Sequence, residues 1–194
     1  MTADTRKRPV KYSQLEWRNK AGESFDAFRE DCLAYLKETD ALFSGCAVEL
    51  GENGKVILEG NFHEGRPHGE EIWFHENGNR NSLVTFQHGL RHGPHLVWHE
   101  DGELQIDVCY NKGKRDGHHS VFYESGQKRS QADFVNDKLH GLYITWHEDG
   151  TKKSERTFKD GAEVKRREWK RDGAQKDLKN WTPTGTAREA TVEA

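Results

Sequence analysis

The sequence has few apolar residues and no long hydrophobic run. Only 32% of its 194 residues are hydrophobic, and no window approaches the ~20 apolar residues that a transmembrane helix needs. The first ten residues are polar, so no secretory signal is expected. Such a composition argues against a thick globular core and is common in disordered chains. Six tryptophans argue against disorder, because disordered chains are poor in aromatic residues.

Cysteine and excess charge are also scarce. Cys32, Cys46 and Cys109 are widely separated and form no CxxC pair, which predicts thiols in a reducing cytoplasm and no disulfide framework. The net charge of -3 produces no overall field that favours nucleic acid. Basic residues concentrate only in residues 1–22 and 165–179, which we expect to be solvated ends.

Catalytic motifs are absent as well. The sequence contains no phosphate-binding glycine-rich loop, no GxSxG motif and no recognisable cysteine nucleophile. All 11 histidines lie between His63 and His147, but equivalent ones should stand two strands apart, roughly 2 × 4.8 Å. That separation is too large for ligands of one zinc ion. The sequence therefore predicts no enzyme, no cofactor and no metal site.

Glycine, by contrast, is abundant and periodic. Three series of turn positions repeat every 24 residues without insertion or deletion. They are Gly45, Gly69, Gly93, Gly117 and Gly141; Gly54, Gly78, Gly102, Gly126 and Gly150; and Gly65, Gly89, Gly113, Asp137 and Gly161. After Gly161 the pattern decays, because Lys165 stands at a glycine position and Gly173 comes one residue early. A fixed period of this length indicates a stacked repeat protein with an atypical last unit.

Aromatic residues follow the same period and are predicted to form the structural core of the repeats. One series is Phe62, Phe86, Tyr110, Phe134 and Phe158, and the other is Phe74, Trp98, Phe122 and Trp146.

Each repeat has the pattern of a β-hairpin. Residues 95–99 and 104–110 alternate as strands do, and Asp101-Gly102 between them supplies the positive φ of a hairpin turn. Residues 111–114 should form a looser turn into the next repeat. The predicted fold is mainly β: an open, elongated, single-layer antiparallel β-meander of 24-residue hairpins. It covers residues 44–173, with five repeats and a degenerate half-repeat, between a basic segment 1–22 and a tail 174–194.

A capping helix is expected before the first repeat, within residues 23–43. Ser24 suits a helix N-cap, and apolar residues from Phe25 to Leu36 recur at helical spacing, which predicts a helix from Ser24 to Lys37. Such a helix would protect the exposed edge strand of an open sheet.

The repeats resemble a known family. Phe43-Ser44-Gly45 and the segments 68–78 and 92–102, each running from His-Gly through an aromatic residue to Asn-Gly or Asp-Gly, are similar to the MORN-repeat variant of bacterial antitoxin-like proteins. The resemblance covers about residues 43–173. It implies a single-layer hairpin array that binds protein or lipid, and an association with toxin–antitoxin pairs.

Eight residues are the candidates for binding a partner. Four are expected to point away from the main aromatic face, and four to form a half-exposed ladder next to them. They are Trp73, Val97, Val121 and Thr145, and His75, His99, Tyr123 and His147. The leading hypothesis is a non-enzymatic protein-binding module, as an antitoxin-like inhibitor of a toxin or other protein. The alternatives are an adaptor for anionic membrane surfaces and nucleic-acid binding through residues 165–179 with Trp169 and Trp181.

Overall fold

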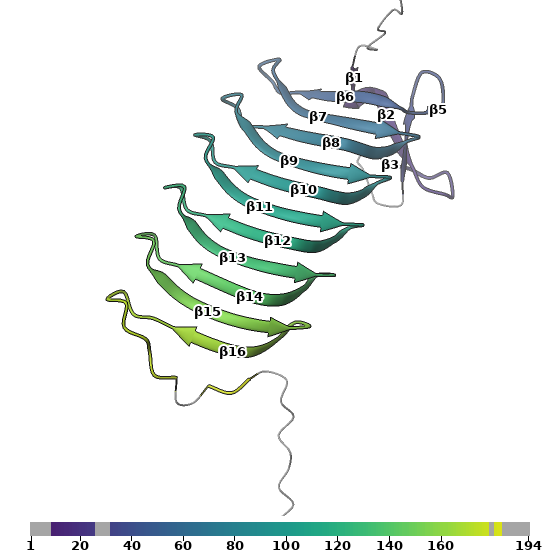
Figure 1. Ribbon diagram of the computed structural model, residues 1–194. Coiled ribbons are helices and arrows are strands. Elements are labelled where there is room, and N and C mark those ends of the chain that lie inside the picture. The colour runs from purple at the N-terminus through teal and green to yellow at the C-terminus, as the bar shows by residue number, and fades with distance from the viewer. Residues whose placement is uncertain (1–8, 26–31, 179–180, 184–194) are drawn as a thin grey trace, which may run out of the picture. The chain divides into compact units, whose positions relative to one another are not determined.

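The computed structural model describes residues 9–25, 32–178 and 181–183, and its elements are β-strands apart from one short 3-10 helix (Figure 1). The N-terminal elements are β1 (Val10–Lys11), η1 (Tyr12–Gln14), β2 (Leu15–Arg18), β3 (Ser24–Phe25), β4 (Leu33–Leu36) and β5 (Ala41–Leu42). The hairpin strands are β6 (Gly45–Leu50), β7 (Val56–His63), β8 (Arg66–Phe74), β9 (Arg80–Gln87), β10 (Leu90–Trp98), β11 (Leu104–Asn111), β12 (Lys114–Phe122), β13 (Lys128–Val135), β14 (Lys138–Trp146), β15 (Lys152–Lys159) and β16 (Ala162–Glu168).

The chain forms two compact units. Unit 1 comprises residues 1–104 and 110–113, and unit 2 comprises residues 105–109 and 114–194. In unit 1 one sheet has the order β1-β6-β7-β8-β9-β10 and a second, smaller sheet has the order β3-β2-β4-β5. In unit 2 the strands β12 to β16 are neighbours in chain order. All these hairpin pairings are antiparallel, which confirms the predicted meander.

The Asn-Gly and Asp-Gly turns are wider than a two-residue hairpin loop. At Asn77-Gly78, His75 N–H donates to the Asn79 carbonyl at 2.8 Å and Gly78 N–H to the His75 carbonyl at 2.9 Å. Only the glycine has positive φ, +92°. The same two bonds recur in the turns of Gly54, Gly102, Gly126, Gly150 and Gly173.

The other series of turns is the tighter one, contrary to the expectation of a looser turn. At Lys112-Gly113 both central residues have positive φ, +49° and +85°, as in a type I′ turn. This turn follows the right-handed twist of the two strands, so two residues suffice to reverse the chain. At the position where glycine is replaced, Asp137 adopts φ +67°.

The contact of Asp137 with Arg115 helps to hold this turn. Its Oδ1 accepts hydrogen bonds from Arg115 N at 3.0 Å and Arg115 Nε at 3.2 Å. Asp tolerates the left-handed region better than most residues with a Cβ, and these hydrogen bonds lower the pKa of the Asp137 carboxyl.

The helix predicted for Ser24–Lys37 is wrong. Leu33–Leu36 form strand β4, Ser24–Phe25 form strand β3, and residues 26–31 lie outside the described residues. β4 pairs with β2 in antiparallel register, with Ala34 opposite Trp17. The short apolar run Leu33 to Leu36 fits a half-buried strand as well as a helix, and this pairing decides between them.

A compact apolar cluster lies at the start of unit 1. Phe62 contacts Trp17 and Phe43, with ring centroids 5.6 Å and 5.7 Å apart. The buried members are Leu15, Trp17, Cys32, Ala34, Phe43, Ala47 and Phe62. β1 pairs with β6 in parallel, so residues N-terminal to the repeats occupy part of the edge of the first hairpin.

The last hairpin has lost a residue at a defined place. Between β13 and β14, Asp133 pairs with His140 and Ala132 with Tyr143, which leaves two extra residues in a bulge. Between β15 and β16, Phe158 pairs with Glu163 and Thr157 with Lys165, which leaves only Val164. The deletion therefore shortens the bulge, and the strand returns to its register beyond it.

Candidate binding surface

Strand alternation divides the aromatic residues between two faces. This corrects the expectation that Trp73, Val97, Val121 and Thr145 all point away from the aromatic residues. Trp73 pairs with Leu58, and Phe62 lies four residues after Leu58 on the same strand, so Trp73 and Phe62 share a face. In unit 2 the rings of His119 and Phe134 are 5.6 Å apart on the corresponding face. The Phe62 series therefore lies on the face of the binding candidates, and only the Phe74 series alternates to the other.

The aromatic series differ in how deeply they are buried. Phe62 and Phe134 are buried. The other members, Phe74, Phe86, Trp98, Tyr110, Phe122, Trp146 and Phe158, are half-buried, as expected of a sheet one layer thick.

Three of the eight candidates lie together in unit 2. Val121, Tyr123 and Thr145 line a pocket of about 560 Å³, which we call the basic pocket. Across the strands, Val121 pairs with Ser130, Ser130 with Thr145 and Thr145 with Ser154. The hydroxyls of Thr145 and Ser154 are 2.8 Å apart and share a hydrogen bond. The pocket wall is thus a row of small side chains across four strands.

Two cations enter the pocket from β-bulges. Arg129 lies between Ser130 and Lys128, which pair with consecutive residues of β12, so it has no partner of its own. Lys153 has the equivalent position on β15, and both side chains line the pocket. A bulge turns a side chain away from strict alternation. Arg129 and Lys153 are not among the eight candidates predicted from the sequence, although their 24-residue separation was a usable signal.

Arg156 is the third cation of the pocket. Its Nε is buried and has no hydrogen-bond partner among the described residues. The guanidinium lies 5.9 Å from the centroid of the Tyr143 ring. Burial first, and then Arg115 and His118, lower the pKa of neighbouring His119, which disfavours a further positive charge there.

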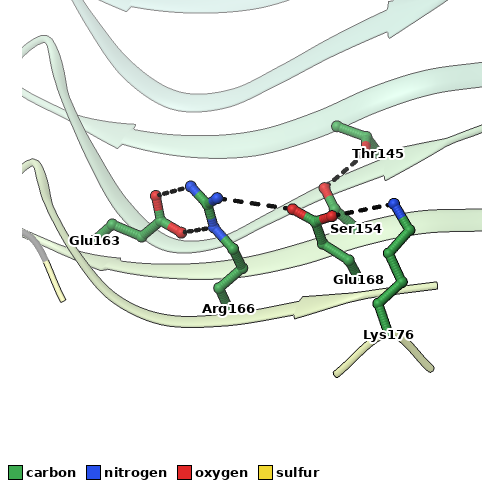
Figure 2. A network of polar contacts seen from close by, with 6 residues as sticks. All are labelled: Thr145, Ser154, Glu163, Arg166, Glu168 and Lys176. Carbon is green, nitrogen blue, oxygen red and sulfur yellow. Dashed lines mark hydrogen bonds and ion pairs between the residues drawn. The ribbon is translucent and has the colours of Figure 1, made fainter. Parts of the chain in front are cut away.

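Ion pairs border the pocket on the side of β16 (Figure 2). Glu163 accepts from Arg166 Nε at 2.7 Å and from Arg166 Nη2 at 3.0 Å. Glu168 lies between Arg166, at 3.7 Å, and Lys176, at 3.3 Å. The hydrogen bonds from Arg166 lower the pKa of Glu163, which is 6% exposed. With Arg167, which lies 3.7 Å from Glu155, three cations of the basic run 165–179 are therefore already paired with carboxylates.

The expected ladder makes hydrogen bonds from one hairpin to the next. His75 Nε2 lies 3.0 Å from the Trp98 carbonyl oxygen in unit 1. In unit 2, the hydroxyl of Tyr123 donates to the Trp146 carbonyl at 2.9 Å. His99 and His147, at equivalent positions, are half-buried. His75 and Tyr123 therefore have a structural role, because each links its hairpin to the next one, in addition to any role in binding.

In unit 1 the corresponding face has a different character. Trp73 is 43% exposed, and its Nε1 donates to Glu71 Oε1 at 3.2 Å. Burial raises the pKa of Glu71. Val97 is half-buried on β10. The bulge positions that carry Arg129 and Lys153 in unit 2 are occupied in unit 1 by the neutral residues Ile57 and Asn81.

The described residues contain neither a metal-binding cluster nor a transmembrane helix. No three His, Cys, Asp or Glu side chains gather within ranges 9–25, 32–178 and 181–183 as metal ligands would. No helix in the same ranges has the length and apolar character of a membrane span.

The hairpin period, the two kinds of turn and the open antiparallel strand order define a β-hairpin repeat protein. A family model described as MORN repeat variant matches four consecutive segments, residues 67–88, 91–112, 115–136 and 139–160. Residues 67–160 therefore contain four consecutive repeats of the MORN repeat variant. Repeats of this family are non-catalytic modules that generally bind proteins or membranes. No curated protein matches the chain significantly.

Proposed function

We propose that the chain is a non-enzymatic, cytoplasmic protein-binding module that recognises its partner through the face carrying Val121, Tyr123 and Thr145. The observation that supports this most is the basic pocket, a concave site of about 560 Å³ on the repeat face. A volume of this size accommodates several side chains of a partner. The family supports binding rather than catalysis.

An inhibitory, antitoxin-like role is the specific form of this proposal. An inhibitor needs only to cover a surface of its target, and a sheet of repeated hairpins offers such a surface without any reactive group. The partner would then be a toxin or another protein that the chain holds inactive.

Site-specific photo-crosslinking tests the binding face. A photoreactive phenylalanine analogue at Val121 should crosslink one protein stoichiometrically in extracts of the source organism. The same analogue at Thr157, on the opposite face of β15, is the matched control. Equal crosslinking from both positions, or no stoichiometric product from Val121, would refute the proposal.

The same preparation separates this role from the two alternatives. Flotation with anionic vesicles at low salt should leave the protein unbound, because Arg166 and Lys176 of the basic run are already paired. Flotation that Lys165→Gln abolishes would instead favour the membrane adaptor. Salt-sensitive binding to RNA or DNA would favour nucleic acid.

A further inference from the structure

We propose that the basic pocket binds an extended acidic peptide segment whose carboxylates are spaced every third residue. This inference rests on the proposed protein-binding role and specifies the chemistry of the partner. It is carried by three cations, Arg129, Lys153 and Arg156, whose side chains line the pocket.

Three of the four cations that line the pocket form no ion pair with a carboxylate; the fourth, Lys176, is paired with Glu168. Arg129, Lys153 and Arg156 form no ion pair with any described residue, and the buried Nε of Arg156 has no acceptor there. The pocket's own carboxylate, Glu168, is already shared by Arg166 and Lys176. Because a buried unsatisfied donor is unfavourable, the pocket favours a ligand that brings acceptor oxygens with negative charge.

The spacing of the cations indicates more than one negative charge. Arg129 and Lys153 occupy equivalent bulges on β13 and β15, two strands apart, which corresponds to about 9.6 Å. One phosphate would have to draw both long side chains together, whereas two separate negative charges match the spacing of the strands that carry them. A polyproline II segment advances about 9.3 Å in three residues and returns to the same side, so carboxylates at every third position match the two bulges.

The remaining pocket residues suit a peptide backbone. The hydroxyls of Ser130, Thr145 and Ser154 and the ring of Tyr143 lie among the cations. Hydroxyls can donate to peptide carbonyls and accept from peptide N–H groups. Tyr143 offers an aromatic face on which proline packs well.

A polyanion fits the surface less well. Nucleic acids need a continuous track of cations along their backbone. The equivalent positions of unit 1 are neutral: Ile57 and Asn81 at the bulges, and Gly60 and Val84 in place of Arg156. At these equivalent positions the cations are confined to unit 2, which favours a short acidic segment.

The test is fluorescence anisotropy with the full chain and a labelled nonapeptide of three Glu-Pro-Pro units. We expect saturable binding at low salt that weakens as salt is added. Three other probes are compared with it. The first is the same peptide with Gln in place of each Glu, and the second has the same composition but three consecutive Glu residues. The third is an oligonucleotide of nine thymidylates. Equal binding of the Gln peptide or of the clustered peptide would overturn the proposal, as would tighter binding of the oligonucleotide or displacement by excess inorganic phosphate.

Paired variants locate the site. The double variant Arg129→Gln, Lys153→Gln should weaken peptide binding about tenfold, as expected for the loss of two partly exposed ion pairs. The matched control is Lys159→Gln, Lys165→Gln, which removes the same charge from the opposite face and should leave the affinity within about twofold. An equal loss of peptide affinity in both variants would show that net charge alone attracts the peptide, and would refute binding in the basic pocket.

The two proposals can fail separately. Suppose that a partner crosslinks through Val121, and that the Arg129→Gln, Lys153→Gln variant still crosslinks this partner although it no longer binds the peptide. Protein binding is then supported, but the proposal that the partner binds through an acidic segment is refuted. If the peptide binds as expected but no protein partner crosslinks, the pocket chemistry stands and the proposed function fails.

Discussion

The two units build the same hairpin from different interactions. Among the residues that the structure describes, thirteen hydrophobic residues are buried and ten of them belong to unit 1, whereas the three buried polar residues, Ser120, Ser154 and Glu163, all belong to unit 2. Unit 1 packs Trp17 and Phe43 around Phe62. Unit 2 instead has ion pairs along its last strand, β16, between Arg166 and the carboxylates of Glu163 and Glu168 (Figure 2).

This difference follows from what each unit has next to its repeats. Unit 1 has the additional strands β1 to β5, which supply apolar side chains and cover part of an edge. In unit 2, β16 carries the charged run Lys165, Arg166 and Arg167, and charged residues protect an edge strand by discouraging further pairing. Burial in one unit and polar contacts in the other should respond differently to mutation, pH and salt.

The largest expected effect is the loss of the unit 1 cluster. Trp17→Ala should lower the free energy of unfolding by about 3–5 kcal/mol, because Trp17 is only 4% exposed and its removal leaves a cavity. Urea denaturation measures the loss, and hydrogen exchange resolved by segment should place it in residues 10–62. Trp73→Ala, at an exposed tryptophan of the same unit, should lower it by less than about 1 kcal/mol. Similar losses in the two variants would contradict the cluster.

The ion pair of unit 2 should contribute less. Glu163→Gln should destabilise the protein by about 1–2 kcal/mol, because it leaves Arg166 without its principal carboxylate while Glu168 remains nearby. Arg166 lowers the folded-state pKa of Glu163, so the stabilisation is present above the unfolded pKa and lost as pH falls through the folded value.

Stability measured at pH 7 and about pH 4 checks that sign. The difference between wild type and Glu163→Gln should shrink toward the lower pH. Glu148→Gln, at an exposed turn carboxylate, is the control and should change little. A difference that stays constant with pH would show that charge is not involved.

A smaller effect is expected at His119. Its pKa is lower in the folded state, chiefly through burial, so the unfolded chain binds more protons at mildly acidic pH. The contribution of His119 to the free energy of unfolding should therefore be fully present above the unfolded pKa of about 6.5 and should decrease as the pH falls below it. His119→Phe retains an aromatic ring against Phe134 and should flatten this dependence between about pH 7.5 and 5.5.

The repeat was predictable because turns and strand alternation are local. The 24-residue period gave the hairpins, their number and the positions of Gly54 and its equivalents, and the turns with positive φ follow from them. Strand β4 was missed because the short run Leu33 to Leu36 fits both periods, and pairing with β2, a contact distant in sequence, decides the outcome.

The candidate surface was only partly predictable. Val121 and Thr145 were selected from alternation and Tyr123 from the 24-residue ladder of His75, His99 and His147, and the structure brings the three together in one pocket. Arg129 and Lys153 were not, because their direction depends on a bulge in the register rather than on residue type. The face of the Phe62 series was misassigned because alternation along one strand does not say which face the next strand presents until their pairing is known.

The smallest predicted effect concerns the turn that distinguishes unit 2 at Asp137. Asp137→Ala retains a Cβ at φ +67° and loses both hydrogen bonds to Arg115, so its melting temperature should fall by about 2–4 °C. Asp137→Gly loses the same bonds but removes the backbone strain, as at Gly113 in unit 1, and should melt within about 1 °C of wild type. Calorimetry compares the two variants directly. If glycine proves as harmful as alanine, the contact with Arg115 and not the left-handed backbone governs this turn, and the polar character of unit 2 extends to its loops.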